Sequence, residues 1–407
     1  MPERIELEHV RKLYPGGNLA LDDVSLAIQP GELLVLLGSS GSGKTTLLRC
    51  LCGIERISGG RIRIGERTMA DDRVHLPPER RDLAMVFQDY ALWPHMVARD
   101  NVAFALRRRG MTRAQRHAAA DAMLARVGLQ ALRDRYPNEL SGGEQQRVAL
   151  ARALVAGTGV LLCDEPLSNL DADLRDRLRI EIASLVRAAG VTTVYITHDQ
   201  AEAFALADRV GVLDHGRLVQ VGTPEEIYSS PCSAFVARFT GLSGALRGRL
   251  VGQARAAGEP VEVALPTSAP GHAAHVRARA MAPLRSGAAV QVMLRPTAVQ
   301  MVDADSPEAQ LLAVVRDAAF NGRGYGCVLA LGSGIELTGA FSRRRPARGA
   351  TVGVRLEASG ALAFADDATS PVPSLPLGAL PGAARSARER EPILEATGMQ
   401  ALDDDWD

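Results

Sequence analysis

The stretch GSSGSGKT, residues Gly38 to Thr45, restricts the fold more than any other part of this chain. It matches the eight-residue phosphate-binding loop in which backbone N–H groups surround a phosphate. An apolar run, LLVLLG at 33–38, precedes the loop, and KTTLLRCLCGI at 44–54 continues it with apolar residues at helical spacing. A strand, a glycine loop and a helix in this order predict an α/β domain built on parallel strands.

Residues of this loop carry the expected phosphate chemistry. The Lys44 ammonium should reach the β and γ oxygens of a nucleotide, and the Thr45 hydroxyl should bind Mg²⁺. The remaining nucleotide-binding positions of the loop are predicted to be Gly38, Ser39, Ser40, Gly41, Ser42, Gly43 and Thr46. By itself the loop indicates only a nucleotide phosphate, because kinases, GTPases and many ATPases share it.

Polar residues follow three further apolar strands. VLLCDEP at 160–166 ends in Asp164 and Glu165, which we assign to magnesium and to the general base. TTVYITH at 192–198 places His198 at the same sheet edge, where we expect it to hydrogen-bond the γ-phosphate. Gln88 in MVFQDY also follows a short apolar strand, and its side chain is expected to contact Mg²⁺ or the attacking water. Each residue has an alternative interpretation. The two acids can form a turn that caps the next helix, His198 can be a structural histidine, and Gln88 can have no functional role.

A second phosphate-binding pattern lies in LSGGEQQRVALARAL, residues 140–154. Ser141, Gly142 and Gly143 run straight into an amphipathic helix, and the N-terminus of a helix favours anions. In SNLDADLR the residues Ser168 and Asp171 suit helix capping, which is the alternative to a functional role for this loop.

Composition limits the class of protein. A length of 407 residues with 46% apolar content suits two or three packed domains, and 47 basic residues balance 47 acidic ones. No global basic field therefore indicates nucleic acid, and the arginine runs at 107–109 and 343–345 suit solvated faces. Five scattered cysteines favour a reduced cytoplasmic compartment. No signal-peptide pattern is seen, and no apolar run reaches the ~18 residues of a membrane span.

The sequence pattern changes at several points after the first strands. The segment from about 100 to 140 is helical in character, which suggests a helical insertion within the α/β unit. Residues 242–365 contain short strand patterns such as VQVMLRP and TVGVRLE, which predict a small all-β, barrel-like domain. The stretch from 366 onward, with PVPSLPLGALPG and an acidic DDDWD, is expected to be a disordered tail.

The order of these motifs resembles the ATP-binding subunits of ABC transporters, over nearly all of 4–240, and LSGGEQQR is highly specific to that family. The resemblance implies a RecA-like domain at 4–240 with a helical subdomain at about 90–158, and two copies that enclose two ATP molecules. It also implies that Ser141, Gly142 and Gly143 of one copy bind the ATP held by Lys44 of the other. Tyr14 falls where the family stacks a ring on adenine, and Asp171 where a loop crosses the dimer interface.

The downstream region, with LRPTAVQM at 294–301, resembles the accessory OB-like β-domain of one importer branch. This resemblance implies ATP and Mg²⁺ as cofactors, and an ATPase homodimer at the cytoplasmic face of the membrane. Its partners would be permease subunits, which alone contact the membrane, and a solute-binding protein, with no nucleic acid. Residues 89–101 would form the coupling surface, in which Trp93 and Pro94 suit either core packing or a groove for a partner helix.

The solute is expected to be ferric iron or a polyamine. Sugar, sulfate or phosphonate import is the alternative within the family. Two other classes remain open: a soluble P-loop ATPase that acts on nucleic acid, and a regulatory protein whose β-domain is the output.

Overall fold

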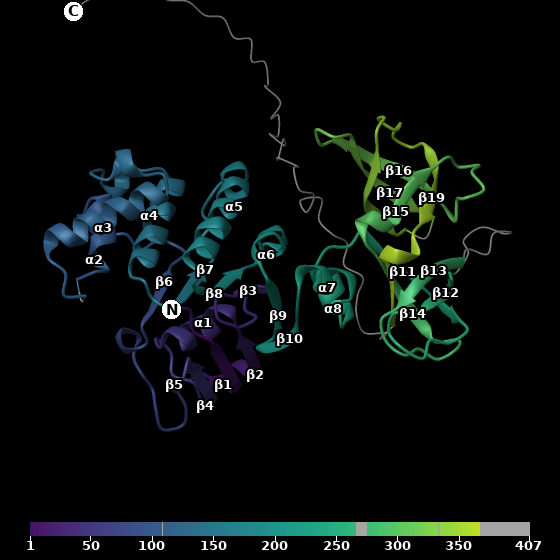
Figure 1. Cartoon of the computed structure of the whole chain (residues 1–407). Helices are drawn as coiled ribbons and strands as arrows, with labels where there is room; N and C mark the ends of the chain where they lie inside the picture. The colour runs from purple at the N-terminus through teal and green to yellow at the C-terminus, as the bar shows by residue number, and fades with distance from the viewer. Residues whose placement is uncertain (108, 266–274, 333, 367–407) are drawn as a thin grey trace, which may run out of the picture.

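The computed structural model describes residues 1–366 except 108, 266–274 and 333 (Figure 1). A six-stranded sheet with the order β10-β9-β3-β8-β7-β6 lies at the centre of residues 1–240. All its strands are parallel except β10, which pairs with β9 in the antiparallel direction. The strands are β3 (Leu33–Gly38), β6 (Leu83–Val86), β7 (Val160–Asp164), β8 (Thr192–Thr197), β9 (Arg209–Asp214) and β10 (Arg217–Gly222).

The apolar side chains of β3 supply two cores, because successive residues of a strand point to opposite faces. Leu33, Val35 and Leu37 join a core with residues of helices on one face of the sheet. Leu34 and Leu36 join a second core on the other face. The first face is covered by α4 (Gly142–Val155), α5 (Ala172–Ala189) and α6 (Gln200–Leu206).

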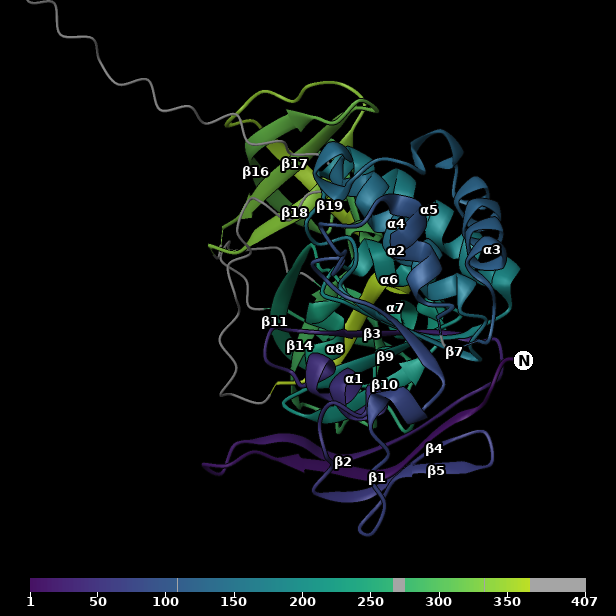
Figure 2. The ribbon, with the colours of Figure 1, turned by 90° about the vertical axis from the view of Figure 1, so that its left-hand side faces the viewer.

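On the second face, α1 (Lys44–Cys52) lies between the central sheet and a smaller antiparallel sheet (Figure 2). That four-stranded sheet has the order β2-β1-β4-β5. Its strands are β1 (Ile5–Leu13), β2 (Leu19–Ile28), β4 (Gly59–Ile64) and β5 (Arg67–Ala70). The helix that begins at the phosphate loop is therefore held from both sides, which fixes the position of the loop.

A helical unit with its own core stands at one side of the sheet (Figure 1). It contains α2 (Ala98–Phe104), α3 (Arg113–Arg126) and α4. Both α3 and α4 begin with a capping box, in which Thr112 pairs with Gln115 and Ser141 with Glu144. These reciprocal hydrogen bonds fix where each helix starts.

Two short helices, α7 (Pro224–Ser229) and α8 (Ala234–Phe239), connect this part to two closed five-stranded barrels. The first barrel has the order β11-β12-β13-β20-β14 and the second β15-β18-β17-β16-β19. Because β20 returns to the first barrel, the second barrel is an insertion between β14 and β20. The first barrel contains β11 (Gly244–Val251), β12 (Pro260–Ala264), β13 (His275–Ala280), β14 (Ala289–Leu294) and β20 (Ala361–Ala365). The second contains β15 (Val299–Val302), β16 (Leu311–Phe320), β17 (Tyr325–Leu331), β18 (Glu336–Ser342) and β19 (Thr351–Leu356).

The sequence predicts one barrel-like domain in this region, whereas the strands close into two barrels that share a hydrophobic core. The rhythm of strands along the chain does not show that β20 pairs with both β13 and β14, since that pairing joins residues far apart in sequence. The predicted tail from 367 onward lies outside the described residues.

A buried arginine attaches the first barrel to the preceding helices. Arg295 is 2% exposed, and its guanidinium donates to the carbonyls of Ala237 and Gly241 at 2.9 and 2.6 Å. It also donates to the carbonyl of Tyr228, and its guanidinium lies 4.1 Å from the centre of that ring. Across residues 1–366 with the gaps given above, no helix combines the length and apolar content needed to cross a bilayer.

Candidate functional site

The loop between β3 and α1 has the backbone geometry that phosphate binding requires. Gly41 and Gly43 adopt φ values of +80° and +102°, in the left-handed region that favours glycine. A Cβ atom on Gly43 would lie 2.5 Å from the carbonyl oxygen of Ala20, so no larger residue fits there. Gly43 is also the N-cap of α1, so the loop ends at a helix N-terminus with unpaired N–H groups.

The Lys44 side chain is 4% exposed and is held inside this loop. Its Nζ donates to the carbonyl oxygens of Gly38 at 2.8 Å and Ser39 at 2.9 Å. Burial lowers the pKa of Lys44, while the negative charges of Glu165 and Asp164 act in the opposite direction. The ammonium is thus oriented toward the loop. The carbonyl oxygens that contact it carry only partial negative charge, and a bound phosphate would supply a full one.

Asp164 and Glu165 lie at the end of β7, beside this loop. Burial, with the neighbouring Glu165 charge, raises the pKa of Asp164, and the Thr45 side chain hydrogen-bonds to its carboxylate. Glu165 has φ +42°, an uncommon conformation for a residue with a side chain, and its N–H donates to the carbonyl of Ile196 at 3.1 Å. Its Oε2 is 2.9 Å from Nδ1 of His198, which follows β8. The structure therefore brings the predicted base and the predicted histidine into direct contact.

A cavity of about 410 Å³ opens over the loop. It contains Tyr14, which follows β1, and Glu165, so the predicted adenine and hydrolysis residues share one space with the loop. The Tyr14 ring is half-buried, with Nζ of Lys12 4.7 Å from its centre. The other lining residues from the loop are Ser40, Gly41, Ser42, Gly43, Lys44, Thr45 and Thr46.

Sequence reasoning missed a second wall of this cavity. It consists of Asn18, Leu19, Ala20, His215 and Gly216. Gly216 has φ +78°, and its N–H donates to the carbonyl of Ser42 at 3.0 Å, so the β9–β10 turn supports the loop. The turn sequence Asp-His-Gly at 214–216 marks this position locally, but nothing in it indicates contact with a loop far away in sequence.

Gln88 and Asp171 do not line the cavity that contains Lys44. Gln88 follows the edge strand β6 and is exposed. Its carbonyl accepts a hydrogen bond from Asn169 Nδ2 at 3.0 Å, which ties it to the SNLD loop. Asp171 caps α5, because its Oδ1 accepts from the N–H of Leu174 at 2.9 Å. The capping role considered for Asp171 is therefore present.

Ser141, Gly142 and Gly143 begin α4, in the helical unit, and do not line the cavity over the phosphate loop. The Ser141 hydroxyl donates to Glu144 Oε2 at 2.8 Å. At Gly143 a Cβ atom would lie 3.0 Å from the Leu174 side chain, so this helix start packs closely against α5. Within one chain, the two phosphate-binding patterns are not brought into one site.

The segment 89–101 packs on the helical unit. The Trp93 ring is half-buried, with its centre 4.1 Å from that of Phe104. Arg152 of α4 lies 5.0 Å from the centre of the Trp93 ring and donates to the carbonyls of Tyr90 and Ala91. Trp93 therefore takes part in packing, while Pro94 is exposed.

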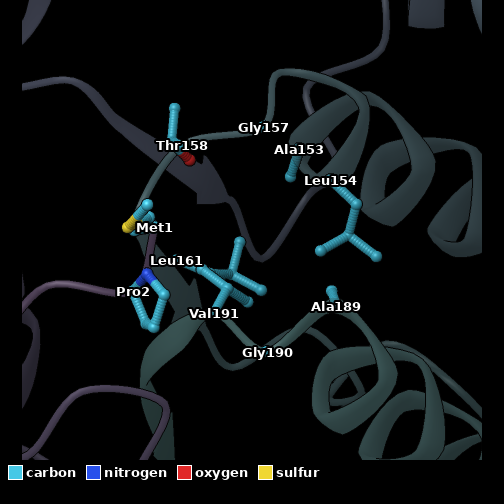
Figure 3. A pocket seen from close by; sticks show the side chains of 10 residues that line it. All are labelled: Met1, Pro2, Ala153, Leu154, Gly157, Thr158, Leu161, Ala189, Gly190 and Val191. Carbon is cyan, nitrogen blue, oxygen red and sulfur yellow. The ribbon is translucent and has the colours of Figure 1, made fainter.

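A smaller cavity of about 140 Å³ lies where β7 and β8 begin (Figure 3). Met1 and Pro2 close one side of it, and Ala153, Leu154 and Val191 project from the others (Figure 3). None of the ten side chains that line it is charged.

Comparison with known proteins agrees with this geometry. The family described as ABC transporter matches residues 21–168. An Fe(3+) ions import ATP-binding protein of Agrobacterium fabrum is 49% identical over 252 residues, which are 62% of this chain and 70% of that protein. An sn-glycerol-3-phosphate import ATP-binding protein of Roseobacter denitrificans is 48% identical over 238 residues, which are 58% of this chain and 65% of that protein.

Among solved structures, a dimeric ATP-binding cassette in a post-hydrolysis state with ADP and Pi is 30% identical, with a TM-score of 0.48. It covers 54% of this chain and 98% of its own. The identity to the two import proteins, together with the site built by the phosphate loop, the strand-end acids and His198, settles the family. The chain belongs to the ABC transporter family, in its branch of import ATP-binding proteins.

Proposed function

We propose that this chain hydrolyses ATP to drive solute import across the cytoplasmic membrane, as a homodimer bound to permease subunits on the cytoplasmic face. A solute-binding protein would deliver the solute to the permease. The observation that carries this proposal is the contact between Glu165 and His198 in the same site as Lys44. A carboxylate at this position can accept a proton from water as the water attacks the γ-phosphate.

ATP would bind in the cavity over the phosphate loop. The Tyr14 ring offers a surface for the adenine, and the N–H groups at the start of α1 face the phosphates. Lys44 would exchange its hydrogen bonds to loop carbonyls for phosphate oxygens. His198, whose Nδ1 is 2.9 Å from Glu165, would orient that carboxylate and interact with the γ-phosphate.

Mg²⁺ fits the oxygens at the end of β7. The Thr45 hydroxyl and the Asp164 carboxylate are already hydrogen-bonded to each other, and the raised pKa of Asp164 shows that its charge is under-compensated. Hydroxyl, carboxylate and amide oxygens suit this cation, so Thr45, Asp164 and Gln88 would hold it. When bound, the cation neutralises charge on the transferred phosphoryl group.

Two copies are required because the second phosphate pattern lies away from Lys44 in the same chain. The exposed Ser141, with Gly142 and Gly143 after it at the start of α4, would bind the γ-phosphate held by the second copy, with Asp171 beside the interface. Each γ-phosphate would then stabilise the closed dimer, and its release on hydrolysis would let the copies separate.

The variant Glu165→Gln tests this mechanism. Loss of the base should lower ATP hydrolysis by about 10²–10⁴-fold, while ATP binding persists and holds the dimer closed. Analytical ultracentrifugation with and without ATP measures the dimer. The matched control is Glu79→Gln, an exposed glutamate away from the site, which should match the parent chain. Hydrolysis by a monomer of Glu165→Gln at the parent rate would contradict the proposal.

Ferric iron is the solute that we propose first, with a polyamine next and sn-glycerol-3-phosphate as the competing candidate. Import proteins named for Fe(3+) and for sn-glycerol-3-phosphate are similarly close to this chain, so the cassette does not separate the two. Uptake of each labelled solute in cells with and without the gene distinguishes them. Hydrolysis stimulated by DNA, with no permease retained on purification, would instead favour a soluble machine acting on nucleic acid.

A further inference from the structure

The second barrel exposes an aromatic ring beside a cluster of arginines. Phe341 on β18 is 46% exposed. Exposed arginines occupy the two neighbouring turns. We define the arginine–aromatic surface as Phe341, Arg323, Arg343, Arg344 and Arg345.

Strand pairing places the Phe341 ring over β17. Gly326 of β17 pairs with Phe341, whereas its neighbour Tyr325 pairs with Phe320, so Phe320 points to the opposite face of the sheet and is not part of this surface. Arg323 lies in the turn between β16 and β17, and the three consecutive arginines directly follow β18. These strands stand side by side in Figure 2, at the opposite end of the molecule from the β1–β2 sheet.

The backbone fixes the Phe341 ring in place. A Cβ atom on Gly324 would lie 2.5 Å from Cζ of Phe341, so the ring rests directly over a glycine. Gly326 on the neighbouring strand adds no side chain beside it. The exposed ring is therefore a rigid platform, and a second ring can stack on it with little loss of conformational freedom.

The charge of this region is unbalanced. Residues 318–350 contain five arginines (323, 343, 344, 345 and 348) and one acid (Glu336), which gives a net charge of +4 in a chain whose overall charge is zero. In the part of the chain that the structure describes, none of the four arginines of the surface has an ion pair with an acidic side chain. The surface therefore suits a partner that carries several negative charges and an aromatic ring.

We propose that residues 403–407 of the same chain, Asp-Asp-Asp-Trp-Asp, bind the arginine–aromatic surface. The segment carries four carboxylates and Trp406, so its charge of −4 complements the +4 of residues 318–350. The indole stacks on Phe341, and the aspartates pair with the arginines, which also favour aromatic faces. The 36 residues 367–402 separate Asp366 from Asp403. At ~3.3 Å per residue they can span roughly 120 Å, so the connection does not prevent the contact.

Fluorescence of Trp406 tests this contact in the full-length chain without nucleotide. The chain has two tryptophans, Trp93 and Trp406, so the difference between the parent and Trp406→Phe isolates the emission of Trp406. If the segment is bound, the emission maximum is shifted to the blue and quenching by neutral acrylamide is weak. Replacing Arg343, Arg344 and Arg345 together by Glu should reverse the blue shift and raise the quenching constant at least about twofold, because a ring in contact is shielded from solvent.

A matched variant controls for the change in charge. Arg255, Arg277 and Arg285 are exposed arginines scattered over the first barrel, and their replacement by Glu changes the net charge equally. That variant should leave Trp406 shielded. Raising the salt to about 1 M, where charges are screened beyond ~3 Å, should weaken the contact in the parent. Circular dichroism and basal ATP hydrolysis should be unchanged in both triple variants, since neither touches the ATP site.

Three results would overturn the assignment. Trp406 that is equally exposed to acrylamide in the parent and in the Arg343/Arg344/Arg345→Glu chain rules out docking. Shielding that disappears on dilution assigns the contact to a second copy rather than to the same chain. Tight binding of a single-stranded oligonucleotide that depends on Phe341 and these arginines, with Trp406 exposed throughout, assigns the surface to nucleic acid.

Discussion

The cassette (residues 1–240) and the two barrels (242–366) use buried charge in different ways. Both contain a fully buried arginine whose hydrogen bonds go to neutral acceptors: Arg81 in the cassette, 1% exposed, and Arg295 in the first barrel, 2% exposed. The cassette adds Lys44 and Glu165, which line one cavity at the edge of the sheet, and Asp164 beside them at the end of β7. The barrels bury an apolar core and keep the charges of the second barrel outside.

The two buried arginines have different roles, one near the ATP site and one at the junction between domains. Arg81 donates to the carbonyls of Cys50 and Leu51 at 2.7 Å each, at the C-terminal end of the helix that begins with Lys44. It therefore holds the C-terminal end of α1, whose N-terminal end carries the phosphate loop. Arg295 instead holds carbonyls of α7 and α8 and the following turn, which fixes the barrels to the cassette. A buried arginine thus supports the active site in the cassette, and another buried arginine supports the junction between the cassette and the barrels.

The largest expected effect comes from Lys44→Ala. Removal of the buried ammonium from the phosphate site should lower ATP hydrolysis by about 10²–10³-fold, since it is a preorganised charge facing the phosphates. Its matched counterpart in the barrels is Arg316→Ala, which removes an exposed cation from β16. Steady-state phosphate release should show no change for Arg316→Ala. A comparable loss in both variants would abolish the distinction between the two regions.

The part of the site that was predictable from sequence is the part written in short local patterns. The phosphate loop and the strand-end acids are contiguous in the chain and have strict chemical requirements, so their types and spacing identify them. The contact of His198 with Glu165 follows from the parallel pairing of β7 and β8, which the apolar runs already suggest. His215 and Gly216 were missed because they approach the loop only through the fold.

Arg81 and Arg295 were not recognised as buried, because an arginine in sequence is ordinarily expected at the surface. Their roles depend on free carbonyls at helix ends that are far away along the chain. The two-barrel topology was also beyond the sequence pattern. Its closing strand β20 pairs with β13 and β14 after an insertion of five strands, and a strand's residues do not encode its partner.

Arg81→Met should affect both stability and activity. Carbonyls of Cys50, Leu51 and Leu76 would lose their donor inside the core, at a cost of about 3 kcal/mol in unfolding free energy. Displacement of α1 should also lower hydrolysis by roughly tenfold to a hundredfold through misplacement of Lys44. Calorimetry and steady-state kinetics at saturating ATP measure the two effects. Parent kinetics in a destabilised Arg81→Met chain would show that Arg81 does not position the loop.

Arg295→Met should have a smaller effect that falls on the junction alone. Loss of its bonds to Ala237, Gly241 and Tyr228 should cost about 2 kcal/mol and split thermal unfolding into separate transitions for the cassette and barrels. Basal hydrolysis should stay within about twofold of the parent, because no catalytic side chain contacts this residue. Calorimetry and limited proteolysis between α8 and β11 test this. A loss of hydrolysis as large as that of Arg81→Met would mean that the junction acts on the ATP site.

The smallest expected effect is on the pH dependence of stability at Asp164. Its raised pKa means that the folded chain binds this proton more tightly than the unfolded chain does, where the ordinary value is 3.8. Stability from this group is therefore greatest at low pH and falls as pH rises from 3.8 through the raised folded value. Asp164→Asn removes the cost of burying this charge, so without nucleotide its Tm should exceed that of the parent above this window. The difference should shrink toward pH 3.8.

Asp164→Asn should also weaken the binding of Mg²⁺. If Asp164 holds Mg²⁺, ATP with Mg²⁺ should raise the Tm of the parent far more than that of Asp164→Asn, since a ligand stabilises the folded state according to its affinity. Glu79→Gln is the control, because this exposed glutamate does not line the cavity. A lower Tm for Asp164→Asn without nucleotide would show that the carboxylate is fully compensated by Lys44 and Arg49. It would then be a structural charge, and the difference between the cassette and the barrels in their use of buried charge would fail at its most sensitive point.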